Sequence, residues 1–208
     1  MQSTHYNDNV FINCPFDSAY KPLFDAMVFT VHDCGFVARC ALEEGDASQV
    51  RIDKIYSIIE DCRYGIHDIS RTELDETLLL PRFNMPLELG IFLGAKRFGV
   101  EEQERKQCLV MDKEQYRYQK FISDIAGQDI SVHNDSPEEV VKVVQYWLFT
   151  ASKRQTIPGG STIWQRYQDF LHDLPQLARR LQRDVADLEH FNAYTFAVAE
   201  WLSLQPSG

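Results

Sequence analysis

The stretch NVFINCPFDSAYKPLFDAMVFTVHDCGFVARCAL, residues 9–42, contains two kinds of hydrophobic pattern. Residues 9–15 form a short run of apolar side chains that Pro15 ends, which predicts a strand. Residues 17–35 carry apolar side chains at helical spacing until Gly35, and residues 36–42 predict a second strand. A strand, a helix and a strand in this order indicate the start of an α/β fold.

The same alternation continues to residue 153. Further helices are predicted at 48–63, 81–99, 115–126 and 136–153, and further strands at 64–70, 107–112 and 128–134. Ser136 is the expected N-cap of the last of these helices, since Pro137 suits its first position and Glu139 its third. Five short apolar strands, each followed by a helix, predict a parallel sheet covered on both faces. We therefore expect a flavodoxin-like, doubly wound, five-stranded parallel sheet.

A turn-rich break at 154–162 separates this α/β domain, residues 1–153, from a C-terminal helical extension at 161–203. Apolar residues recur in the extension at helical spacing, and Pro175 interrupts them, so two or three helices are expected. Large aromatic side chains such as Trp164 and Trp201 are frequent there. They predict a homo-oligomer that buries surplus apolar surface, and the alternative is that these helices pack back on the domain.

The composition argues against several kinds of partner. The net charge of -10 disfavours a nucleic-acid polymer or an anionic membrane surface. No apolar run approaches the roughly 20 residues of a membrane span, and the polar N-terminus lacks the apolar region of a signal peptide. The five cysteines form no CxxC pair and the six histidines show no ligand spacing. We expect reduced thiols, a cytoplasmic location and no metal site.

Ligands of an open parallel sheet bind beyond the carboxyl ends of its strands, so the residues that follow each strand are the candidates. They are Asn13, Phe16, Asp17 and Tyr20 after the first strand, Asp68 and Ser70 after the third, and Asn84 and Glu88 at the start of the helix at 81–99. Phe16 and Tyr20 either stack on a base or belong to the core. Asp68 either binds a ligand or stabilises a turn. Cys14 is a weak candidate nucleophile, because the pattern places no histidine beside it.

Glu88 lies among apolar residues in the predicted helix at 81–99. Because Pro86 disfavours a helical residue before it, Met85 is the expected N-cap and Glu88 the third helical residue. There a Glu caps the helix and complements its dipole. Equally, its carboxylate can face the crevice and act on a cationic transition state or a sugar carbon. Gly90 and Gly94 are expected to let this helix approach the sheet closely.

Two familiar types of site are disfavoured. The loop NCPFDS after the first strand has no glycine, so neither the GxGxxG fingerprint nor a P-loop is present, and hydride transfer with a bound dinucleotide is disfavoured. No cofactor is expected. A receiver domain needs an acidic cluster after the first strand and a Lys after the last. The first loop offers only Asp17, and ISVHNDSPEE has no Lys.

The motifs VFINCPFDSAY, DIS and FNMPLELGIFLGAK resemble those of nucleoside 2-deoxyribosyltransferase-like proteins and of the wider group that contains bacterial TIR-like domains, over roughly residues 9 to 135. The resemblance implies a flavodoxin-like sheet and identifies Glu88 with the catalytic carboxylate of those families. Asp68 matches an aspartate that helps to bind the nucleoside. The chain departs from the family in the glycine-free first loop and in the C-terminal extension.

Together these observations predict an enzyme that cleaves or transfers the N-glycosidic bond of a nucleoside, nucleotide or NAD. Glu88 would attack or shield the anomeric carbon, Asp68 would orient the sugar, and Asn13 and Asp17 would contact the sugar or base. Phe16, Tyr20, Ser70 and Asn84 complete the predicted substrate site. The alternative is a non-catalytic module that binds or senses a nucleotide, or that mediates an interaction.

Overall fold

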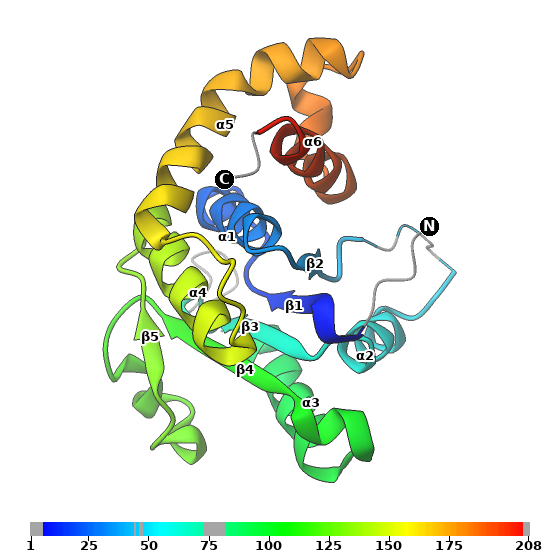
Figure 1. The fold of residues 1–208 in the computed structure, drawn as a ribbon. Coiled ribbons are helices and arrows are strands. Elements are labelled where there is room, and N and C mark those ends of the chain that lie inside the picture. The colour runs from blue at the N-terminus through cyan, green and yellow to red at the C-terminus, as the bar shows by residue number, and fades with distance from the viewer. Residues whose placement is uncertain (1–5, 44, 46–47, 73–81, 206–208) are drawn as a thin grey trace.

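The structure is a computed structural model that describes residues 6–43, 45, 48–72 and 82–205. Its centre is a five-stranded parallel sheet (Figure 1). The strands are β1 (Asn9–Asn13), β2 (Val37–Arg39), β3 (Tyr64–Asp68), β4 (Gln107–Asp112) and β5 (Ile130–Val132). Their order, β2-β1-β3-β4-β5, is the flavodoxin-like order, so the predicted fold class is confirmed.

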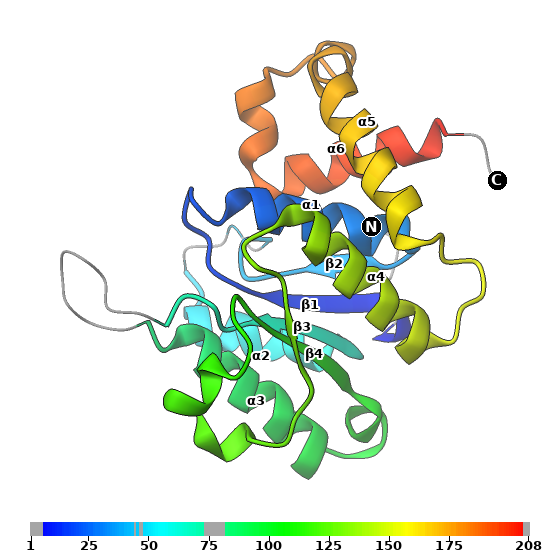
Figure 2. The same cartoon turned by 90° about the vertical axis from the view of Figure 1, so that its left-hand side faces the viewer.

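Helices cover both faces of the sheet (Figure 2). The helices α1 (Lys21–Asp33) and α4 (Pro137–Ser152) lie on one face, and α2 (Arg51–Glu60) and α3 (Asn84–Phe98) lie on the other. As a result every residue of the central strands β1 and β3 is buried. At the start of α4, Ser136 Oγ accepts a hydrogen bond from the Glu139 backbone N–H at 3.4 Å, which confirms the predicted cap.

The predicted helix at 115–126 is wrong. This segment forms two short 3-10 helices, η3 (Arg117–Lys120) and η4 (Ser123–Ile125). The backbone of Tyr116 is left-handed, with φ of 61°, and Ile122 leaves the helical region with φ of -136° and ψ of 71°. Tyr118 and its apolar neighbours instead pack in a small cluster with Leu89 of α3 and Val110 of β4. Further 3-10 helices are η1 (Tyr6–Asp8), η2 (Glu101–Arg105) and η5 (Val185–Glu189).

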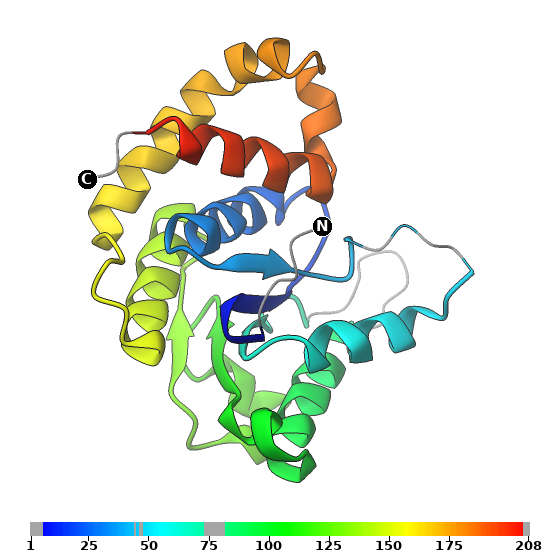
Figure 3. The same cartoon turned by 45° about the vertical axis from the view of Figure 1, so that its right-hand side comes forward.

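The C-terminal helices α5 (Gly160–Arg180) and α6 (Phe191–Ser203) pack on the outer side of α1 (Figure 3). The ring of Phe29 in α1 lies 5.2 Å from that of Tyr167, 5.3 Å from Phe170 and 5.9 Å from Trp201. Much of the aromatic surface predicted to drive self-association is therefore buried within the chain. The packing-back alternative describes these helices, and the oligomeric state stays a prediction.

One close approach positions α3 on the sheet. A Cβ atom added at Gly65 of β3 would lie 2.8 Å from His67 Nε2 and from the ring of Phe92. Glycine there lets these two rings pack at a centroid distance of 4.9 Å. By contrast, an added Cβ at Gly90 or Gly94 would meet no atom within 4 Å, so the close packing predicted for these two glycines is wrong.

We expect Gly65→Ala to destabilise the fold by about 1 to 3 kcal/mol, because overpacking forces the rings of His67 and Phe92 apart. Gly90→Ala is the matched control and should stabilise it by about 0.5 to 1 kcal/mol, since alanine is the better helix former and meets no neighbour. Urea unfolding of both variants measures the two effects. Equal stability of the two variants would contradict this account of Gly65.

Candidate functional site

Glu88 does not cap its helix. The N-cap of α3 is Phe83, whose carbonyl accepts the hydrogen bond from the Leu87 N–H at 2.9 Å, so Glu88 is the fifth helical residue. The prediction of Met85 as the N-cap is therefore wrong. Pro86 is tolerated at the third position because the first N–H groups of a helix have no intrahelical partner to lose. Glu88 is therefore not explained by a helix-capping role.

The carboxylate of Glu88 is on the buried face of α3. Met85, Glu88, Leu89 and Phe92 are the buried residues of this helix, and Glu88 is only 8% exposed. No other described residue forms a hydrogen bond or an ion pair with Glu88. The side chain lines a pocket of about 150 Å³ between α2 and α3. The other lining residues are Arg51, Ile52, Ile55, Asn84 and Leu87.

Burial raises the pKa of Glu88 to about 7, although the charge of Arg51 opposes the shift. The charge of Glu88 also affects the pKa of a thiol at the end of a strand. Burial raises the pKa of Cys14 well above its ordinary value, and the charges of Asp68 and Glu88 add to this effect. Cys14 directly follows β1. Asn13, the last residue of β1, also donates from Nδ2 to the carbonyl of Met85 at 2.8 Å, one turn before Glu88 in α3. This turn of α3 therefore lies close to the carboxyl end of β1, at the edge where ligands of parallel sheets bind.

Asp68 ends β3 and is fully buried. Its Oδ2 accepts a hydrogen bond from the Tyr20 hydroxyl at 2.6 Å and lies 2.9 Å from Nε2 of His133, and its Oδ1 accepts from the Ser70 N–H at 2.8 Å. Burial alone would raise the pKa of Asp68, but His133, Ser70 and Tyr20 together hold it below its ordinary value. Asp68 contacts protein groups in this structure, and its predicted contact with a ligand stays a prediction.

The other candidates fall into four places. Asn84 shares the pocket of Glu88, while Tyr20 and Ser70 are buried beside Asp68. Phe16 and Asp17 line a second pocket of about 250 Å³. Asn13 is 2% exposed and bonds to protein groups. The second pocket is completed by Pro15, Ser18, Lys21, Phe24, Leu42 and Glu189.

Sequence reasoning missed three of the residues at these places. His133 directly follows β5, so the strand-end rule could have found it. Arg51 is the first residue of α2, where nothing in the pattern distinguishes it from a solvated charge. Glu189 comes from the C-terminal extension, and no local signal shows that the extension reaches the second pocket.

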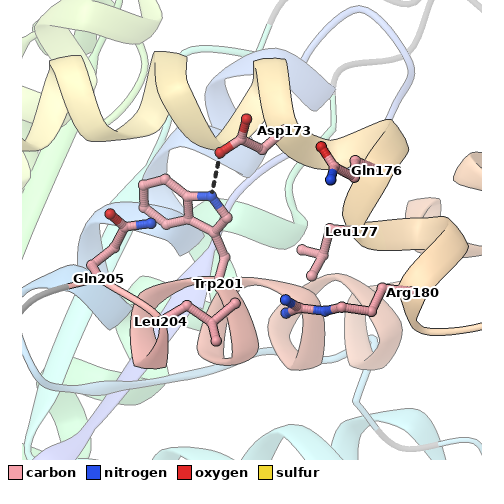
Figure 4. Close-up of a pocket in the computed structure, with 7 residues that line it drawn as sticks. All are labelled: Asp173, Gln176, Leu177, Arg180, Trp201, Leu204 and Gln205. Carbon is pink, nitrogen blue, oxygen red and sulfur yellow. Dashed lines mark hydrogen bonds between the residues drawn. The ribbon is translucent and has the colours of Figure 1, made fainter.

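A groove of about 460 Å³ between α5 and α6 is larger than either of these two pockets (Figure 4). Its residues are Asp173, Gln176, Leu177, Arg180, Trp201, Leu204 and Gln205. Asp173 is engaged there, because it accepts the indole N–H of Trp201 at 3.0 Å. The groove contains no strand-end residue and no candidate nucleophile beside a base. Size alone therefore does not identify the functional site, and the unpartnered carboxylate of Glu88 is the stronger indicator.

Two searches within the described residues gave negative results. No group of three or more His, Cys, Asp or Glu side chains there is arranged to hold a metal ion. Nor does any helix in that part of the chain have the length and apolarity needed to cross a membrane.

Comparison of the chain with protein-family models, with curated proteins and with solved structures gave no match. The resemblance to nucleoside 2-deoxyribosyltransferase-like and TIR-like proteins therefore stays a proposal that depends on the quoted motifs and on the position of Glu88.

Glu88 should reduce stability at high pH. Because its pKa in the folded state is raised to about 7 from 4.5, the folded state holds the proton more tightly. The stability that this proton contributes is present below about pH 4.5 and is lost as the pH rises through 7, a loss of up to about 3 kcal/mol. Glu88→Gln should lack this loss and be the more stable protein at pH 8.5. Urea unfolding of both proteins from pH 5 to 8.5 measures it, and a constant difference between them would contradict the assigned burial.

Proposed function

We propose that this protein cleaves or transfers the N-glycosidic bond of a nucleoside, nucleotide or NAD, with Glu88 as its catalytic carboxylate. One observation carries the proposal. The carboxylate of Glu88, 8% exposed, without a partner among the described residues and with its pKa raised to about 7, lines a pocket near the carboxyl end of β1. Such a group is a stability liability at neutral pH, and strongly shifted carboxyl groups in pockets are typical of functional sites.

The chemistry suits a carboxylate in a partly desolvated pocket. The C–N bond breaks with its electron pair leaving on the base, and positive charge develops at the anomeric carbon. Ionised Glu88 would stabilise that charge or attack the carbon to form a glycosyl-enzyme. Water or a second base then attacks the same carbon, and its proton passes to the released base. In the covalent route Glu88 leaves with the bonding pair. No cofactor is needed for these steps.

The neighbouring residues suit supporting roles. Asn84 and Arg51 line the pocket of Glu88 and offer an amide and a guanidinium to sugar hydroxyls or an anionic group. Phe16 and Asp17 line the second pocket, which would receive the rest of the ligand. Asp68, Tyr20 and Ser70 would orient the loop after β3. The free cysteines among the described residues suit the proposed cytoplasmic location.

Base release tests the proposal. Purified protein is incubated with NAD, deoxynucleosides and their monophosphates, and released bases are separated by chromatography. We expect release from at least one class, with kcat/KM rising as the pH passes about 7 because the carboxylate is the active form. Glu88→Gln should lose at least about 100-fold in kcat while it remains folded. Binding of a nucleotide without release would instead support the non-catalytic module.

Cys14 should be dispensable. It is 2% exposed, and burial raises the pKa of its thiol well above its ordinary value, so the reactive thiolate is scarce at pH 7. We expect Cys14→Ser to keep base release within about tenfold, or about 1.4 kcal/mol of barrier. Complete loss of activity in a folded Cys14→Ser protein would make Cys14 the nucleophile and remove that role from Glu88.

A further inference from the structure

The strand β1 has an asparagine at each end, and both are buried. Asn9 is 1% exposed and Asn13 is 2% exposed. The Nδ2 of Asn9 donates to the Asp61 carbonyl at 2.9 Å, at the end of α2. The Nδ2 of Asn13 lies 2.8 Å from the Met85 carbonyl and 3.0 Å from Nδ1 of His67. The two asparagines thus bind different helices from opposite ends of one strand.

Both amide hydrogens of Asn13 are used inside the protein. Burial lowers the pKa of His67 to about 3, so its ring is neutral and Nδ1 can accept a hydrogen bond. A primary amide has two N–H donors, and Asn13 directs one at His67 and one at Met85. No amide hydrogen remains for a ligand, so the predicted contact between Asn13 and the sugar or base loses its donor.

Asn13 contacts α3 directly before Glu88 and, through His67, after it. Met85 lies one turn before Glu88 on the same buried face, and Phe92 lies one turn after it. Asn13 holds the carbonyl of Met85, and His67, its other partner, packs against the ring of Phe92 at 4.9 Å. Because a helix is stiff over two turns, fixing it on both sides of Glu88 fixes the Cα of Glu88 as well.

Few other hydrogen bonds from the described residues hold the first turn of α3. Its N-cap, Phe83, provides no side-chain hydrogen bond to the helix, and Phe83 and Asn84 are both exposed. Pro86 has no N–H to contribute. Among the described residues, Asn13 provides the one side-chain hydrogen bond to a backbone group in residues 84–87.

We propose that Asn13 is a positioning residue for Glu88, and that its hydrogen bond to the first turn of α3 keeps the carboxylate in its buried pocket. The catalytic consequence of this inference rests on the proposed function, but the structural consequence does not. Without the anchor, the first turn of α3 shifts away from β1 and water reaches Glu88.

The experiment follows the carboxyl group of Glu88 directly. Protein labelled with ¹³C at the Glu side-chain carboxyl carbon is titrated by NMR, and the signal that disappears in Glu88→Gln assigns the group. In Asn13→Ala we expect the pKa of Glu88 to fall from about 7 toward its ordinary value by at least about one unit. Asn9→Ala is the matched control, since it also removes a buried amide donor from β1, and should leave that pKa unchanged.

An unchanged pKa of Glu88 in folded Asn13→Ala, or an equal fall in Asn9→Ala, would overturn the inference. If Asn13→Ala does not fold, Asn13→Ser keeps a single donor in a smaller side chain, and it must show a fall that Asn9→Ser does not. Where base release is observed, Asn13→Ala should move the rise of kcat/KM to lower pH by the same shift. If the wild type releases no base but the pKa of Glu88 falls in Asn13→Ala, the proposed function is refuted and the positioning role of Asn13 remains.

Discussion

The rest of the structure depends on the burial of β1 and β3 from both sides. A strand between two layers of helices loses water on both faces, so every polar side chain on it needs a partner within the protein. Asn9, Asn13 and Asp68 each find a hydrogen-bond partner at the ends of the strands, at the C-cap of α2, the first turn of α3 and the N-cap of α1 respectively. Asn9 Oδ1 and His67 Nε2 have no such partner among the described residues. The polar groups that the sheet cannot leave unpaired thus determine how the helices sit on it.

Glu88 of α3 is placed differently, as a comparison with Asp68 shows. Both carboxyl groups are buried at the same edge of the sheet, but the pKa of Asp68 is held low by three partners while that of Glu88 is raised to about 7 by burial. Asp68 is stabilised as an anion and has no open surface. Glu88 lines an open pocket and has no hydrogen-bond or ion-pair partner among the described residues, so a ligand can provide the compensation that these residues do not.

The sequence predicted the fold well because its signals are local and repeated. Strand and helix patterns alternate, and the cap at Ser136 was predicted from three neighbouring residues. The segment at 115–126 was mispredicted because the backbone angles at Tyr116 and Ile122 have no marker in its apolar spacing. The candidate site stays a prediction. The strand-end rule selected Asp68 and Asn13, and the start of the helix at 81–99 added Glu88. The sequence did not show that Asp68 and Asn13 are enclosed, because burial depends on side chains distant in sequence.

The packing of the C-terminal helices also depends on residues distant in sequence, and it affects the second pocket. Their aromatic residues belong to a single hydrophobic cluster with α1 and the sheet, so they complete the layer on that face. They also contact the segment after β2, where Asn192 donates to the Glu43 carbonyl at 3.0 Å, and the helix α1, where Tyr194 donates to the Asp25 carbonyl at 3.0 Å. Glu189 between these helices lines the same pocket as Phe16 and Asp17. The helices that bury Phe29 thus also determine the surface beside the first loop. The shape of the second pocket therefore depends on how these helices pack on the core.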